Sequence, residues 1–222
     1  RVDLVTSRRF KEGALIGQMA KFIQAQEATQ NGAALLETFA EQVVGSGEIK
    51  SVSLQAEVDD QIQLEYLPQH MSKQFDRSPY YDKLMLGYQH YIEVLKSYLT
   101  ADEPELWVPQ VVKVFDDYRI LAAIRHGALG LTQLNLQIEQ RLLEALSLHM
   151  SKQGDWYVGR PVMMTYNDYQ LGLSNGDIGI CFKRSRDGQS QFEVYFPSLE
   201  KWVPATRLPK SIETAFVLTI HK

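Results

Sequence analysis

The stretch YRILAAIRHGALGLTQLNLQIEQRLLEALSL, which runs from Tyr118 to Leu148, decides the class of fold. Its first seven residues are apolar nearly throughout, as in a strand that is covered on both faces within a parallel sheet. A loop bounded by glycines follows at 125–130, and the apolar residues of 131–148 recur at helical spacing. A strand, a loop and a helix in this order predict an α/β fold.

The chain opens in the same order. Residues 2–6 (VDLVT) predict a short strand, 7–10 (SRRF) a basic turn and 11–28 a helix. The elements predicted after these are a helix at 32–45, short strands at 51–57 and 61–67, a helix at 78–97 with Ser78 as its cap, and a helix at 101–118 interrupted near Pro109.

Beyond Trp156 the sequence changes to strands and turns. GRPVMMTYND (159–168) predicts a strand, and the pairs Asn175-Gly176 and Asp187-Gly188 are turn signals between further strands. Closely spaced strands without a helix predict a small antiparallel barrel, because closure hides strand edges. FVLTI (216–220) then predicts a return to a buried strand of the α/β domain.

Composition excludes several classes of protein. The net charge is only −4, so any nucleic acid must be held by local groups rather than by overall charge. The single cysteine, Cys181, cannot form an internal disulfide, and a buried strand position is its expected place. No apolar run is long enough for a membrane span and no signal peptide is visible, so a cytoplasmic location is expected.

The familiar catalytic motifs are also missing. The sequence has no GxxxxGK[ST], GxGxxG, HExxH or GxSxG, and its isolated histidines lack the spacing of metal ligands. The acidic pairs at 59–60 and 116–117 are interpreted as solvated turns or caps. Trp202 and Tyr195 could stack on bases of a single strand, but packing within the β region is the favoured interpretation.

Three basic or polar loops follow predicted strands. These are Ser7-Arg8-Arg9-Phe10, Arg125-His126-Gly127, and the group Thr219, His221 and Lys222 at the end of the last strand. The carboxyl ends of parallel strands meet at one edge of a sheet, where α/β proteins bind ligands. The pattern favours a phosphate or nucleic-acid backbone laid across that edge, with an ordinary surface role as the alternative for the arginines at 8 and 9.

Three segments carry a family resemblance. RILAAIRHGALGLTQLNLQIEQRL, GRPVMMTYNDYQLGLSNGDIGI and AFVLTIHK closely resemble the C-terminal part of the RecD family, the alpha subunits of exodeoxyribonuclease V. The resemblance covers nearly the whole chain and is most specific over 119–222. It implies the second RecA-like (P-loop NTPase type) domain of a superfamily 1, 5′ to 3′ DNA helicase of double-strand break repair and recombination, with an inserted SH3-like β-barrel.

The resemblance also implies domain bounds and site residues. The RecA-like domain is expected at 1–170, the barrel at 171–212 and a return strand, cut within motif V, at 213–222. Arg9 matches the motif IV arginine that reaches ATP phosphates from across the cleft. Arg125 is expected to contact DNA because of its place after a predicted strand, independently of the resemblance. Thr219, His221 and Lys222 match the start of motif V, which continues as SQGSE in the family and touches DNA and the nucleotide site. Asn175, Gly176 and Asp177 match the entry turn of the barrel.

The departures from the family pattern set expectations for this piece. Walker A and B, the rest of motif V and motif VI are absent, so the piece alone is expected neither to hydrolyse ATP nor to unwind DNA. ATP and Mg²⁺ belong to the intact parent, whose expected partners are single-stranded DNA and RecB-like and RecC-like subunits. A stand-alone RecD-like or relaxase-type helicase, and a non-enzymatic SH3-like module for DNA or protein, are the alternatives.

Overall fold

The computed structural model describes residues 49–51, 62–64 and 76–219, and the chain divides into two compact units, Arg1–Asp76 and Arg77–Lys222. In the first unit, β1 (Ile49–Ser51) and β2 (Ile62–Leu64) pair in parallel, with Ile49 opposite Ile62. β2 lies within the strand predicted at 61–67, and β1 overlaps the one at 51–57 only at Ser51. The elements predicted at 2–6, 11–28 and 32–45 lie outside the described residues.

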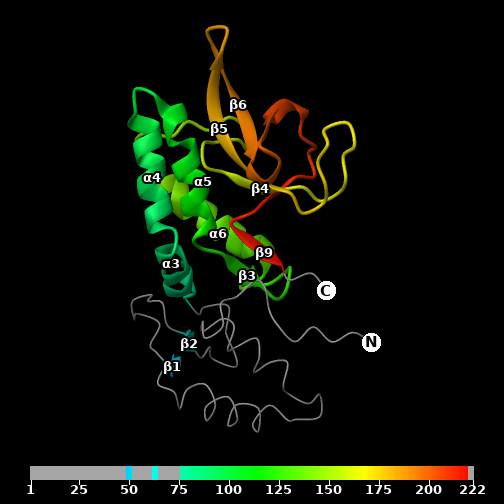
Figure 1. Ribbon diagram of the computed structural model, residues 1–222. Coiled ribbons are helices and arrows are strands. Elements are labelled where there is room, and N and C mark those ends of the chain that lie inside the picture. The colour runs from blue at the N-terminus through cyan, green and yellow to red at the C-terminus, as the bar shows by residue number, and fades with distance from the viewer. Residues whose placement is uncertain (1–48, 52–61, 65–75, 220–222) are drawn as a thin grey trace. The chain divides into compact units, whose positions relative to one another are not determined.

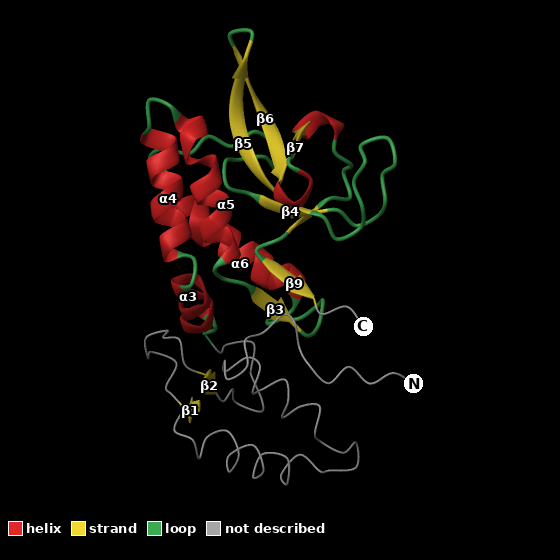
Figure 2. Cartoon of the chain, viewed as in Figure 1, coloured by secondary structure: helices red, strands yellow, loops and turns green. Residues whose placement is uncertain are grey.

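The second unit contains the described helices, a parallel pair of strands and a five-stranded antiparallel sheet (Figures 1 and 2). Its helices are α3 (Ser78–Leu86), α4 (Gln89–Thr100), α5 (Val108–Asp116) and α6 (Leu131–Ala145). The 3-10 turn η2 (Pro104–Trp107) precedes α5, and Pro109 lies in the first turn of α5, where its missing N–H costs nothing. The interruption predicted near Pro109 is therefore the start of α5.

The single helix predicted at 78–97 is wrong, because the helix breaks at Gly87. A Cβ at Gly87 would lie 2.2 Å from the ring of Tyr118, so the backbone and the ring are in direct contact. The Tyr118 hydroxyl donates to the Leu84 carbonyl at 2.8 Å, and the Tyr88 N–H bonds to Met85 instead, at 2.9 Å. Tyr118 thus takes the carbonyl that a continuous helix would offer to Tyr88. The predicted Ser78 cap is also wrong, because Ser78 is the first helical residue.

The α/β part of this unit is built on a parallel pair of strands. β3 (Ile120–Ala122) lies beside β9 (Val217–Thr219), with Ile120 opposite Val217 and Ala122 opposite Thr219. The parallel pairing confirms an α/β arrangement for this part of the chain. The expectation that the strand is covered on both faces is wrong, because Leu121 is 59% exposed while its two strand neighbours are buried.

The β-rich segment forms one antiparallel sheet in the order β7-β6-β5-β4-β8. Its strands are β4 (Pro161–Met163), β5 (Ile178–Arg186), β6 (Gln189–Phe196), β7 (Lys201–Pro204) and β8 (Glu213–Thr214). The β5–β6 hairpin turns at Asp187 (φ +52°) and Gly188 (φ +77°), the left-handed pair of a type I′ turn, as the sequence predicts.

The antiparallel sheet remains open. β7 and β8 are its two edge strands, so the described residues do not form the closed barrel that the sequence predicts. β4 and β8 lie outside the predicted insertion at 171–212. Only Ala215 and Phe216 separate β8 from β9, and therefore the antiparallel sheet continues almost directly into the parallel pair.

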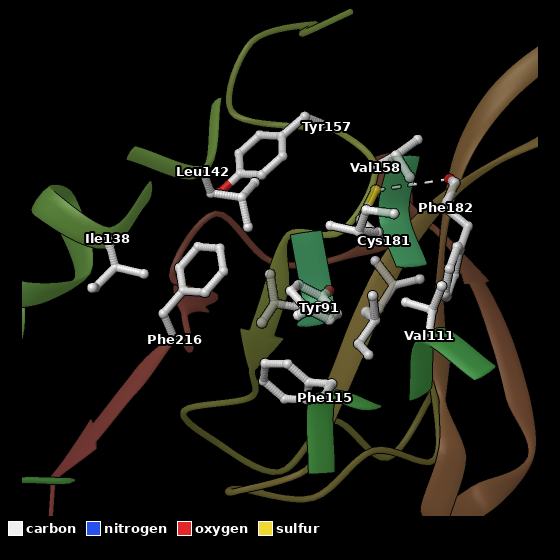
Figure 3. Close-up of a cluster of buried hydrophobic side chains, with 14 of the residues drawn as sticks. Tyr91, Val111, Phe115, Ile138, Leu142, Tyr157, Val158, Cys181, Phe182 and Phe216 are labelled. Atoms are coloured by element: carbon white, nitrogen blue, oxygen red, sulfur yellow. Dashed lines mark hydrogen bonds between the residues drawn. The ribbon is translucent and has the colours of Figure 1, made fainter. Parts of the chain in front are cut away.

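One hydrophobic core joins the helices to both groups of strands (Figure 3). Phe216 points among side chains of α6 and the segment before β4, close to Leu142 and Tyr157. Cys181 of β5 is fully buried, as predicted, and burial raises the pKa of its thiol to about 12. Within residues 76–219 and the two short strands, no helix is both long and apolar enough to cross a membrane.

Candidate functional site

The carboxyl ends of β3 and β9 lie at one edge of the parallel pair. Ala122, the last residue of β3, is opposite Thr219, the last residue of β9. The loop that follows β3 leaves from the same edge at which β9 ends (Figure 2), and this loop includes Arg125. Two of the three loops predicted to meet at this edge therefore begin side by side, the position at which α/β sheets bind ligands.

The loop Arg125–Gly130, called the edge loop below, is tightly folded. The Leu131 N–H bonds to Ile124 at 2.9 Å, and the Gly130 N–H bonds to Gly127 at 3.1 Å. Gly127 has φ +94°, which favours glycine. A Cβ at Gly130 would lie 2.5 Å from the His126 carbonyl oxygen, so this position has no space for a side chain.

The hydrogen bonds of the edge loop also limit its chemistry. The amides of Gly130, Leu131, Thr132 and Leu134 are already bonded to carbonyls of the loop and of the preceding residue. They are therefore not free to surround a phosphate as the amides of a P-loop do.

Arg125 is the exposed guanidinium of the edge loop. Its Nη1 lies 3.3 Å from Oε1 of Glu213 in β8, and the two side chains are 49% and 34% exposed. An ion pair this accessible to water contributes about 0–1 kcal/mol, so a phosphate can displace the carboxylate at small cost. His126 beside it is exposed as well.

A pocket of about 430 Å³ lies under the edge loop. Its wall comprises Arg77, Tyr81, His126, Gly127, Ala128, Thr132 and Gln133. The Tyr81 hydroxyl donates to the Ala128 carbonyl at 2.9 Å and so ties α3 to the loop. The lining residues include side chains with hydroxyl, amide, imidazole and guanidinium groups, which suit a polar or anionic ligand.

The turn predicted at the entry to the β-rich segment is present. The Asp177 N–H bonds to Ser174 at 3.0 Å across Asn175 and Gly176, and Gly176 has φ +91°. The Asp177 carboxylate accepts from the Ser174 N–H at 2.7 Å, and the Asn167 side chain accepts from the Asn175 N–H at 2.9 Å. β5 begins at the next residue, so these side chains set where the sheet starts.

Three predicted site residues cannot be placed. Arg9, His221 and Lys222 lie outside the described residues, so their proposed roles stay predictions. Over the described ranges, no three His, Cys, Asp or Glu side chains gather as a metal site would need. Trp202 and Tyr195 pack against each other with ring centroids 4.9 Å apart and lie against the core, as the favoured interpretation holds.

Sequence reasoning missed Asn135, a polar residue on the buried face of α6. It is only 9% exposed, and its side-chain amide bonds to both backbone groups of Val217. The sequence does contain a signal for this residue, because Asn135 stands at helical spacing between the apolar positions Leu131 and Ile138. A polar residue inside an apolar stripe needs a hydrogen-bond partner.

Comparison with known proteins gives the chain its relatives. No family model matches it. The RecBCD enzyme subunit RecD of Haemophilus influenzae is 26% identical over 95% of the chain. The subunits of the same name from Mycolicibacterium smegmatis and Buchnera aphidicola subsp. Schizaphis graminum are 34% and 23% identical over 51% and 52% of it.

The chain spans only part of these relatives. It covers 38% of the length of the Haemophilus subunit and 19% of the length of the other two. The matches agree with the resemblance that the segments around the edge loop and β9 carry. The chain is therefore a relative of the RecD subunits of RecBCD enzymes, similar to the Haemophilus subunit over nearly its whole length and to the other two over about half of it.

Proposed function

We propose that the chain is part of a RecD-type subunit, an ATP-driven 5′ to 3′ DNA helicase that acts in double-strand break repair with RecB-like and RecC-like partners. In this proposal residues 1–170 form the main part of a second RecA-like domain, residues 171–212 its inserted SH3-like element and residues 213–222 its return strand. The observation that carries the proposal is the parallel register of β3 and β9, which brings the edge loop beside the end of β9.

The proposed ligand of this edge is single-stranded DNA. Arg125 donates to a backbone phosphate, because its planar guanidinium matches two phosphate oxygens. Thr219, His221 and Lys222 contact the strand or the nucleotide from the end of β9. Such contacts fix the path of the strand and carry no base preference.

The proposed ATP site needs the rest of the subunit. Arg9 places positive charge against the γ-phosphoryl group, and the groups that bind ATP and Mg²⁺ directly come from the other RecA-like domain. Substitution of Arg9 by Ala in the intact subunit should lower ATP turnover far more than ATP affinity, since the charge it meets develops in the transition state. Equal turnover in variant and parent would contradict the assignment.

The role of Arg125 is tested by single-stranded DNA binding at several salt concentrations, with a fluorescent oligonucleotide as the probe. Arg125→Ala should weaken binding and lower the slope of log K against log salt by about 0.7, the value for one phosphate contact with a single strand. Glu213→Gln should strengthen binding about two- to five-fold, because it removes both a negative charge and a competitor for Arg125.

Arg207→Ala is the matched control. This arginine is also exposed but lies in η4 (Ala205–Arg207), outside the edge loop, so the same loss of charge should leave the slope unchanged. Equal effects of the Arg125 and Arg207 substitutions would contradict the proposed path of DNA. Tight, salt-resistant binding by the chain alone would favour a non-enzymatic binding module instead.

A further inference from the structure

Asn135 bonds to β9 in the way that a neighbouring strand would. Its Nδ2 donates to the Val217 carbonyl at 3.1 Å, and its Oδ1 accepts from the Val217 N–H at 3.0 Å, across 82 residues of sequence. The two backbone groups of one strand residue point to the same side of the strand. The Asn135 amide therefore lies along the edge of β9 that faces away from β3.

A second side chain holds the preceding peptide. The Tyr88 hydroxyl donates to the carbonyl of Phe216 at 2.5 Å, and both groups are buried. The Ala215 N–H bonds to the carbonyl of Pro161 in β4 at 2.8 Å. Three consecutive residues before the end of β9 are thus each fixed by a partner from a different element.

The side-chain amide of Asn135 fixes the register of β9 as well as filling space in the core. An apolar side chain of similar size would pack in the same core, whereas a buried amide is tolerated only when its donor and acceptor are both satisfied. Both bonds of Asn135 go to Val217, two residues before Thr219. A shift of β9 by one residue would break them, so the pair specifies one register.

The helix that carries Asn135 also carries the edge loop. α6 begins directly after Gly130, and the Asn135 side chain leaves the helix one turn further on. Arg125 adds a direct link to β8 through Glu213. The edge loop and the end of β9 are therefore fixed to the same helix.

We propose that Asn135 is a positioning residue, which holds β9 in the register that brings Thr219 beside the edge loop and the DNA strand proposed to bind there. The inference rests on the proposed function. Asn135 acts through Val217 and makes no contact with DNA or nucleotide.

The test is Asn135→Asp in the intact subunit with its partner subunits, assayed as DNA-stimulated ATP turnover from pH 6 to 8.5. A carboxylate accepts from the Val217 N–H but repels its carbonyl, whereas a protonated carboxyl restores both bonds. Loss of one buried bond should lower kcat on the order of ten-fold at pH 8.5, with KM for ATP unchanged. Burial at this position raises the pKa of the carboxyl well above its ordinary value of about 4. The activity, relative to the parent at each pH, should therefore recover as the pH falls towards 6 and the carboxyl takes up its proton.

Gln140→Glu is the control, since it makes the same amide-to-acid change at an exposed position of α6 and should alter neither kcat nor its pH profile. Asn135→Leu should keep kcat low at every pH. A fall in thermal midpoint without any pH-dependent change in kcat would overturn the positioning role alone. A parent that shows no DNA-stimulated ATP turnover would overturn the proposed function, and the positioning role with it.

Discussion

Removal of one hydroxyl group tests how firmly β9 is fixed. Tyr88→Phe deletes the donor that meets the Phe216 carbonyl at 2.5 Å and leaves the ring in place. That ring makes edge contacts with Tyr118 and Phe216, at centroid distances of 4.9 and 5.7 Å. The substitution therefore isolates the hydrogen bond from the packing.

The expected cost is about 0.5–1.5 kcal/mol, the net contribution of one hydrogen bond, because the Phe216 carbonyl lies on the side of β9 that pairs with β3. For a chain of this size this loss of stability corresponds to a fall of about 1–6 °C in Tm. Urea unfolding followed by circular dichroism should show a lower midpoint with an unchanged m value, because the ring keeps the same surface buried.

Tyr169→Phe provides the comparison. Its side chain is 90% exposed, so loss of its hydroxyl should leave the midpoint within about 0.5 kcal/mol of the parent. Equal effects of the Tyr88 and Tyr169 substitutions would refute the reasoning, because the buried bond would then contribute no more than an exposed hydroxyl.

Two further results are expected. Gly130→Ala should displace the edge loop and weaken DNA binding, since its Cβ would lie 2.5 Å from the His126 carbonyl oxygen. Gly154→Ala, at φ +61° and with no atom within 4 Å of the new Cβ, strains only its own turn outside the edge loop and should leave binding intact. The free energy of unfolding should fall as the pH rises from about 9 to 12, because burial raises the pKa of Cys181, Tyr98 and Tyr118 to about 12 and only the unfolded chain ionises them freely. Urea titrations at pH 8, 9.5 and 11 measure the free energy of unfolding. A free energy that stays constant over this range would show that these groups are not buried.

Elements that depend only on residues close together in the sequence were predicted correctly. Asp187-Gly188 requires a type I′ turn, and it occurs between β5 and β6 because few other pairs accept two positive φ angles. The apolar spacing of 131–148 gave α6, which ends at Ala145. The β3–loop–α6 order was predicted correctly for the same reason.

Features that depend on distant residues were predicted less well. The break at Gly87 needs the ring and hydroxyl of Tyr118, 34 residues from the carbonyl it takes. The exposure of Leu121 depends on which elements cover β3, and an apolar run does not identify them. Closure of the β-rich segment into a barrel likewise requires the edge strands β7 and β8 to meet, which a series of strand and turn signals does not determine.

The candidate site was predicted in outline. Arg125 and Thr219 were assigned to one edge from the rule that parallel strands end together, and β3 and β9 meet that condition. The partner of Arg125 was not foreseen, because Glu213 reaches it from another strand. Asn135 was overlooked because helical periodicity counts apolar residues and passes over a polar one among them.

The junction between β8 and β9 has a consequence for the order in which the unit folds. The Tyr88 bond to Phe216 joins residues 128 apart, and closing a chain loop of that length costs about 4 kcal/mol of entropy. During synthesis the helices and the edge loop leave the ribosome well before β9 does. β3 therefore lacks its pairing partner until β9 is made, and the surface proposed to meet DNA is complete only when β9 has docked.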